Sequence, residues 1–169
     1  ILQSGNFVGT YEIKWLKVTH IEAVDSSVSY ESLVTNGNAE GDDVSCFFAN
    51  EPTVSGTHAA TIGASGTGAD GVGRAFIVKS GNNPSQTYDT QFFVKSSIVL
   101  KKDDICKISF KYKADKAAGS ESQTHTTPGG YIHHDAGVSV NFTTQWQTFE
   151  KEFTVTEQMV THDGIKPFQ

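Results

Sequence analysis

Apolar and polar residues alternate along most of this chain. Between residues 105 and 113, every second position is apolar or aromatic: Cys106, Ile108, Phe110 and Tyr112. A period of two gives a β-strand one buried face and one solvated face. By this criterion the sequence predicts strands at residues 11–18, 74–79, 91–95, 105–113 and 148–156.

The first of these strands changes phase near Trp15. A tryptophan that breaks the alternation of its strand is a candidate for an exposed side chain, and so for a flat ring on which a ligand stacks. Trp146 opens the last predicted strand. We interpret it as a core residue instead.

Glycine-rich stretches at residues 63–73, 81–83 and 128–130 separate the strands, and one helical turn is expected, at 115–118. Short strands with such punctuation predict an all-β fold, a β-sandwich of the jelly-roll type. Residues 33–169 are expected to form the sandwich module and residues 24–32 a linker. Residues 1–23 contribute an N-terminal strand, which either completes the sandwich or belongs to a preceding module.

Composition narrows the classes of function. The 169 residues carry 13 basic and 19 acidic side chains, a net charge of −6, and no basic run is longer than Lys101-Lys102. Nucleic-acid binding is therefore not expected. No apolar run approaches the ~20 residues that cross a bilayer, so no membrane partner is expected either. Of the two cysteines, Cys46 and Cys106, two buried thiols are favoured over a single disulfide.

The segment 82–93 carries the strongest signal for a ligand. Turn residues precede Tyr88, Asp89 and Gln91, and an apolar strand follows. An aromatic ring can stack on the apolar C–H face of a sugar, while amide and carboxylate groups bond its hydroxyls. The alternative is a half-buried tyrosine beside an exposed glutamine, with no role in binding.

A second candidate lies at residues 129–135. Tyr131 and His133 would share one face of a strand, and His125 would join the rim of the same sugar site. One alternative is an ordinary polar loop. Another is a transition-metal site with His134 and Asp135, although no recognised ligand spacing is present.

Catalysis has less support in the sequence. Glu150 and Glu152 lie two apart on one strand and are interpreted as a solvent-facing pair rather than as hydrolytic carboxylates. None of the common hydrolase or nucleotide-binding motifs occurs. The chain is therefore not expected to be an enzyme.

Five motifs in order carry a resemblance to a known family. They are Leu33-Val-Thr-Asn-Gly-Asn-Ala-Glu-Gly-Asp42, Asp70-Gly-Val-Gly-Arg-Ala-Phe76, Tyr88-Asp-Thr-Gln-Phe92, Ile108-Ser-Phe-Lys-Tyr-Lys-Ala114 and Phe142-Thr-Thr-Gln-Trp-Gln-Thr-Phe149. Together they resemble carbohydrate-binding modules of the family 4/9/22 type, such as those attached to or inserted in family 10 xylanases of gut Bacteroidetes. Tyr88 stands where these modules often have tryptophan, and the acidic motif of their last strand is missing. Residues 10–18 are expected to take the place of that strand.

The resemblance implies a function and its partners. The module would bind xylan or xylo-oligosaccharide in an open cleft and would hold a covalently attached glycoside hydrolase, an endo-1,4-β-xylanase, on plant polysaccharide. It would be extracellular, at the cell surface or periplasmic in a bacterium. A structural calcium ion would bind at Asn38 and Glu40. The alternatives are a β-glucan ligand, or a structural or adhesion domain without a sugar site.

Overall fold

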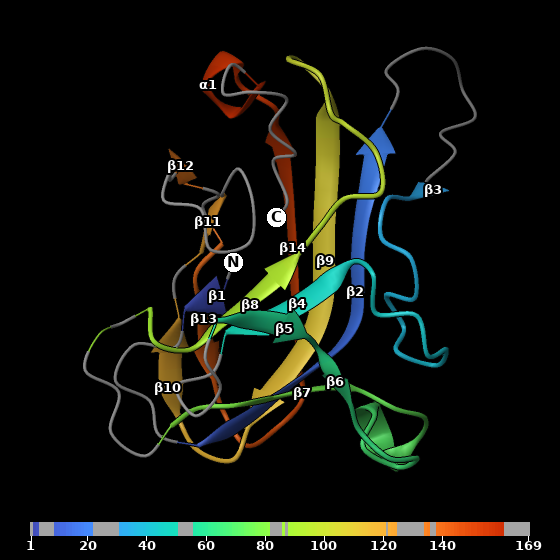
Figure 1. Ribbon diagram of the computed structural model, residues 1–169, viewed down its shortest axis with the longest axis vertical. Coiled ribbons are helices and arrows are strands. Elements are labelled where there is room, and N and C mark those ends of the chain that lie inside the picture. The colour runs from blue at the N-terminus through green and yellow to red at the C-terminus, as the bar shows by residue number, and fades with distance from the viewer. Residues whose placement is uncertain are drawn as a thin grey trace.

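The computed structural model consists almost entirely of β-strands, with one short α-helix in the part of the chain that it describes (Figure 1). That part comprises residues 2–3, 9–21, 31–50, 56–81, 86, 88–120, 122–124, 134–135 and 138–160. All strand pairs in it are antiparallel. The predicted all-β sandwich is confirmed, while its jelly-roll topology stays a prediction.

The larger sheet has six strands. In spatial order they are β14 (Gln147–Thr154), β9 (Ile105–Ala114), β2 (Thr10–Ile21), β7 (Phe76–Lys79) and β6 (Thr61–Ile62), with the short β3 (Glu31–Ser32) paired to the end of β2. Figure 1 shows the long strands β14, β9 and β2 side by side. The N-terminal strand β2 is thus hydrogen-bonded on both sides, to β9 and to β7.

The smaller sheet lies in front of the larger one in Figure 1. It contains β1 (Leu2–Gln3), β8 (Gln91–Val94), β4 (Phe47–Asn50) and β5 (Thr57–Ala59). Two further pairs are β10 (Ala118–Ser120) with β13 (Val140–Phe142), and β11 (Gln123–Thr124) with β12 (His134–Asp135). A 3-10 turn (Ala69–Gly71) and α1 (Glu157–Val160) are the remaining elements.

Aromatic side chains fill the space between the two sheets. The rings of Phe47 in β4 and Phe76 in β7 have centroids 4.0 Å apart, and Phe92 in β8 lies 6.0 Å from Phe47. All three are buried. In β9 every second residue is buried in the same core, as the alternation predicts. The outer faces of the two sheets turn away from this core.

The structure confirms all five predicted strands, which overlap β2, β7, β8, β9 and β14. It also confirms Cys46 and Cys106 as buried free thiols. Burial raises the pKa of the Cys106 thiol to about 12.

Two predictions are wrong. Residues 115–118 do not form a helical turn, because Ala118 already begins β10 and pairs with Phe142 of β13. Trp146 is only partly buried. Its ring lies 5.2 Å from the ammonium of Lys113, a contact that suits the surface of the sheet rather than its core.

Candidate functional site

Trp15 projects from a bulge in the middle of the larger sheet. The register between β2 and β9 shifts between Lys14 and Lys17, so β2 accommodates an extra residue there. As a result Leu16 turns into the core, with 2% of its surface exposed, while Trp15 turns outward and is 52% exposed. The change of phase near Trp15, and the exposure of this residue, are confirmed.

The backbone of Trp15 is strained. Its φ angle is +59°, in the left-handed region. This conformation costs a residue with a Cβ about 1–2 kcal/mol. Strain of this kind is concentrated at functional positions, where the surrounding structure holds a side chain in an otherwise unfavourable place.

Lys14 supports the indole from one side. Its ammonium lies 5.3 Å from the centroid of the Trp15 ring, within the range of a cation–π contact. Only 3% of the Lys14 side chain is exposed, and its ammonium forms an ion pair with the carboxylate of Glu40. A buried charge needs such a partner. The ammonium of Lys14 therefore contacts one face of the ring.

Positive groups also organise the loop of residues 36–43. The Arg74 guanidinium donates to the carbonyls of Glu40 and Gly41, the latter at 2.8 Å, and the Arg74 backbone N–H donates to the Glu40 carboxylate at 3.1 Å. The hydrogen bond from Lys14 is the largest cause, and that from Arg74 the next, of a Glu40 pKa below its usual range. The loop is thereby fixed to the sheet beside Trp15.

Gly73 lies against the Lys14–Glu40 pair. Its φ angle is +66°, and a Cβ at this position would collide with the Glu40 carboxylate and the Lys14 ammonium. Both the backbone angle and the close approach require glycine.

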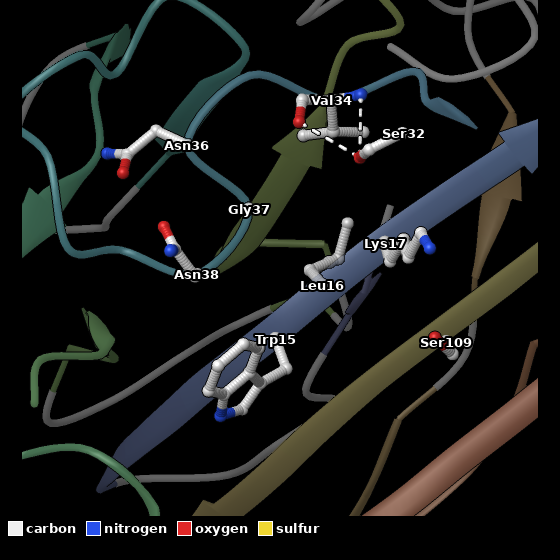
Figure 2. Close-up of a pocket in the computed structure, with 9 residues that line it drawn as sticks. All are labelled: Trp15, Leu16, Lys17, Ser32, Val34, Asn36, Gly37, Asn38 and Ser109. Atoms are coloured by element: carbon white, nitrogen blue, oxygen red, sulfur yellow. Dashed lines mark hydrogen bonds between the residues drawn. The ribbon is translucent and has the colours of Figure 1, made fainter. Parts of the chain in front are cut away.

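Two clefts open beside Trp15, and both are lined by its side chain. The first has a volume of about 430 Å³ and the second about 310 Å³. Figure 2 shows the first: the side chains of Trp15 and Lys17 extend from β2, with the loop that carries Asn38 on one side and Ser109 of β9 on the other. The second is lined by Lys14, Trp15, Glu40, Ala69, Val72, Gly73 and Lys111. Volumes of this size are typical of small-ligand sites.

The site predicted around Tyr88 is only partly open. Tyr88 lies just before β8 and is 51% exposed. The carboxylate of Asp89 accepts a hydrogen bond from the Gln86 backbone N–H at 3.0 Å, so it stabilises this turn. Gln91 is 6% exposed and is the register partner of Asn50, with which it shares the outer face of the smaller sheet. The phenol ring is accessible as expected, whereas most of the Gln91 amide is covered.

The remaining predicted sugar-binding residues, His125, Tyr131 and His133, lie outside the residues that the structure describes. Of the sugar-binding residues predicted from the sequence, the structure therefore describes Tyr88, Asp89 and Gln91. The arrangement at Trp15 was detectable in the sequence only as a break in alternation.

The oxygen atoms of the loop of residues 36–43 do not fit the calcium ion that the resemblance implies. The Glu40 carboxylate pairs with Lys14, and the Asn38 side-chain oxygen accepts the Glu40 backbone N–H at 3.2 Å. The carbonyl of Gly41 accepts hydrogen bonds from Arg74 and Asn36. Calcium prefers six to eight free oxygen ligands. Within the described residues, no three His, Cys, Asp or Glu side chains form a group that could hold a metal ion.

Comparisons with family models, curated proteins and solved structures find no match to this chain. Among the described residues, no helix has the length and apolar character needed to span a membrane.

Proposed function

We propose that this chain is a non-catalytic carbohydrate-binding module for xylan or xylo-oligosaccharide, and that it holds an attached xylanase on plant cell-wall polysaccharide. It would do so in the extracellular space, at the cell surface or in the periplasm of a bacterium. One observation carries the proposal. Trp15 is held outward by a strained bulge, is supported from behind by Lys14, and forms a wall of two open clefts. This is a rigid, exposed aromatic ring with room for a ligand next to it.

The chemistry of the clefts suits a sugar chain. The ring offers an electron-rich face for the apolar C–H bonds of a pyranose. The amide of Asn38 and the hydroxyl of Ser109 line the first cleft and can bond sugar hydroxyls as donors or acceptors. Because the clefts are open, a long polysaccharide can pass across Trp15 without a chain end.

The charges in the clefts favour binding over hydrolysis. Among the residues that line them, Glu40 is the one carboxylate, and it is held by Lys14. Hydrolysis of a glycoside usually requires two carboxyl groups that flank the bond to be cleaved. Binding at an open surface is expected to be modest in affinity, and attachment to an enzyme would raise the local concentration of substrate.

Titration calorimetry with xylohexaose and cellohexaose tests the proposal. Trp15→Ala should weaken the binding of the preferred oligosaccharide by about 1–3 kcal/mol, the usual loss when an aromatic contact is removed. Trp146→Ala is the matched control, because Trp146 lines neither cleft. Comparing the two sugars distinguishes xylan from β-glucan.

Tyr88→Ala in the same titration tests the second exposed ring. If both rings contact ligand, each variant loses affinity. If wild type binds neither sugar, the proposed function fails, and a structural or adhesion domain becomes the better description.

A further inference from the structure

The outer face of the three long strands β2, β9 and β14 carries more positive than negative charge, although the whole chain has a net charge of −6. Residues that pair across β2, β9 and β14 share a face of the sheet. The register therefore places two groups of charged side chains together on the outer face. They are Lys14, Lys17, Lys107, Lys111 and Lys113 on the positive side, and Glu12, Glu150 and Glu152 on the negative side.

Most of these charges are already paired. The ion pairs are Lys113–Glu12 at 3.3 Å, Lys107–Glu150 at 3.0 Å and Lys14–Glu40, and Glu152 stands opposite Lys107 in register. Among the described residues, Lys17 and Lys111 form no ion pair with a carboxylate. These two side chains are therefore available to a ligand.

The two available lysines are next to the ligand-facing ring. Lys17 lines the first cleft and Lys111 lines the second, and Trp15 lines both. A ligand that stacks on Trp15 thus meets an ammonium group in either cleft. An ammonium group is a donor without acceptor capacity, so it prefers a carboxylate to a neutral hydroxyl.

We propose that the glycan bound at Trp15 carries carboxylate groups, as a uronic-acid-substituted plant polysaccharide does, and that Lys17 and Lys111 select it over its neutral counterpart. This inference rests on the proposed function, because it concerns the same ring and the same clefts. The sugar ring stacks on the indole, and the carboxylate of a uronic acid residue pairs with one of the two ammonium groups.

The observations favour an acidic sugar over other anionic polymers. A nucleic-acid site would need phosphate contacts from many basic groups, and here the other lysines of the face are held by glutamates. A polymer with charge alone would not use the exposed indole. A glycan with rings and isolated carboxylates uses both features.

The decisive probes are two xylo-oligosaccharides of the same length. One carries a glucuronic acid branch, and the other is its carboxyl-reduced form, in which that branch is neutral glucose. In calorimetry at low salt, wild type should bind the acidic form about two- to fivefold more tightly, since one solvent-exposed ion pair contributes roughly this much. The preference should shrink as NaCl is raised, because exposed charges are screened.

Variants then assign the preference to the two lysines. Lys17→Met/Lys111→Met should bind both probes equally, with the affinity that wild type has for the reduced probe. Lys79→Met/Lys101→Met removes the same charge from exposed positions that line neither cleft, and should keep the preference. Trp15→Ala should weaken both probes about tenfold.

Each outcome has a clear meaning. Equal binding of both probes by wild type overturns the inference and leaves the proposed function standing. Binding of neither probe overturns the proposed function, and the inference with it. Equally tight binding of polyglutamate would show attraction by charge alone and would also overturn the sugar assignment. A preference for the acidic probe that is lost only in Lys17→Met/Lys111→Met supports the selection of a carboxylated glycan by these two lysines.

Discussion

Replacing Trp15 by glycine and by alanine separates the strain of the bulge from the role of the ring. Both variants remove the indole and its contact with Lys14. They differ in whether a Cβ remains on a backbone with a φ angle of +59°. The difference in stability between the two variants therefore combines the strain with the greater freedom of glycine in the unfolded chain.

The expected difference follows from the backbone angle. A left-handed conformation costs a residue with a Cβ about 1–2 kcal/mol. Glycine avoids this cost but loses about 0.5–1 kcal/mol through the greater freedom of the unfolded chain. Trp15→Gly should thus be about 0.5–1 kcal/mol more stable than Trp15→Ala. For a chain of 169 residues this corresponds to a melting temperature higher by ~1–4 °C.

Urea unfolding followed by circular dichroism measures this difference, and Lys17 supplies the control. Lys17 lies on the same strand beyond the bulge, and its φ angle is not positive. There the order should reverse, with Lys17→Gly less stable than Lys17→Ala by about 0.5–1 kcal/mol. If Gly is also the less stable choice at position 15, the strain argument is refuted, and with it the inference that strain holds the ring in place.

Three further predictions concern the surroundings of the site. Because the pKa of Glu40 is lowered in the folded state, its contribution to stability is present above the unfolded pKa of ~4.3 and is lost as the pH falls through the folded pKa. The difference in urea stability between wild type and Glu40→Gln should therefore disappear in acid. A difference that stays constant from pH 7 to pH 3 would contradict this. Cys46 and Cys106 should react with a thiol reagent only after unfolding, since both are buried and the pKa of Cys106 is about 12. Fast reaction of the native protein with the reagent would contradict the burial of these thiols. Adding calcium or a chelator should leave the melting temperature unchanged, because Lys14 and Arg74 already bind oxygens of the loop of residues 36–43. A melting temperature raised by calcium would support the expected metal site instead.

Strand β9 was predictable because its residues obey one local rule. Residues 105–113 alternate without interruption, and β9 buries every second one of them. The helical turn expected at residues 115–118 failed for a non-local reason. Ala118 pairs with Phe142 in β13, 24 residues later in the chain, and no local propensity contains that pairing.

The candidate site was less predictable than the fold. The exposure of Trp15 was predictable from the break in the alternation of its strand. The first cleft beside Trp15 was not, because its wall is formed by the loop of residues 36–43, which contacts β2 only after folding. The calcium ion expected at Asn38 and Glu40 was implied by the family resemblance. In the structure the Glu40 carboxylate pairs with Lys14, which lies on a strand 26 positions away, and only the folded chain brings the two together.

The place of β2 between β7 and β9 has a practical consequence for anyone who trims this chain. Register partners such as Tyr11 and Ala114 lie 103 positions apart in the chain, so the larger sheet assembles only when both are present. A version that starts after Ile21 would divide this sheet into two fragments and discard Trp15 as well. Expression boundaries chosen from the family-like motifs, which begin at Leu33, would therefore yield an aggregating remnant instead of a shorter working module.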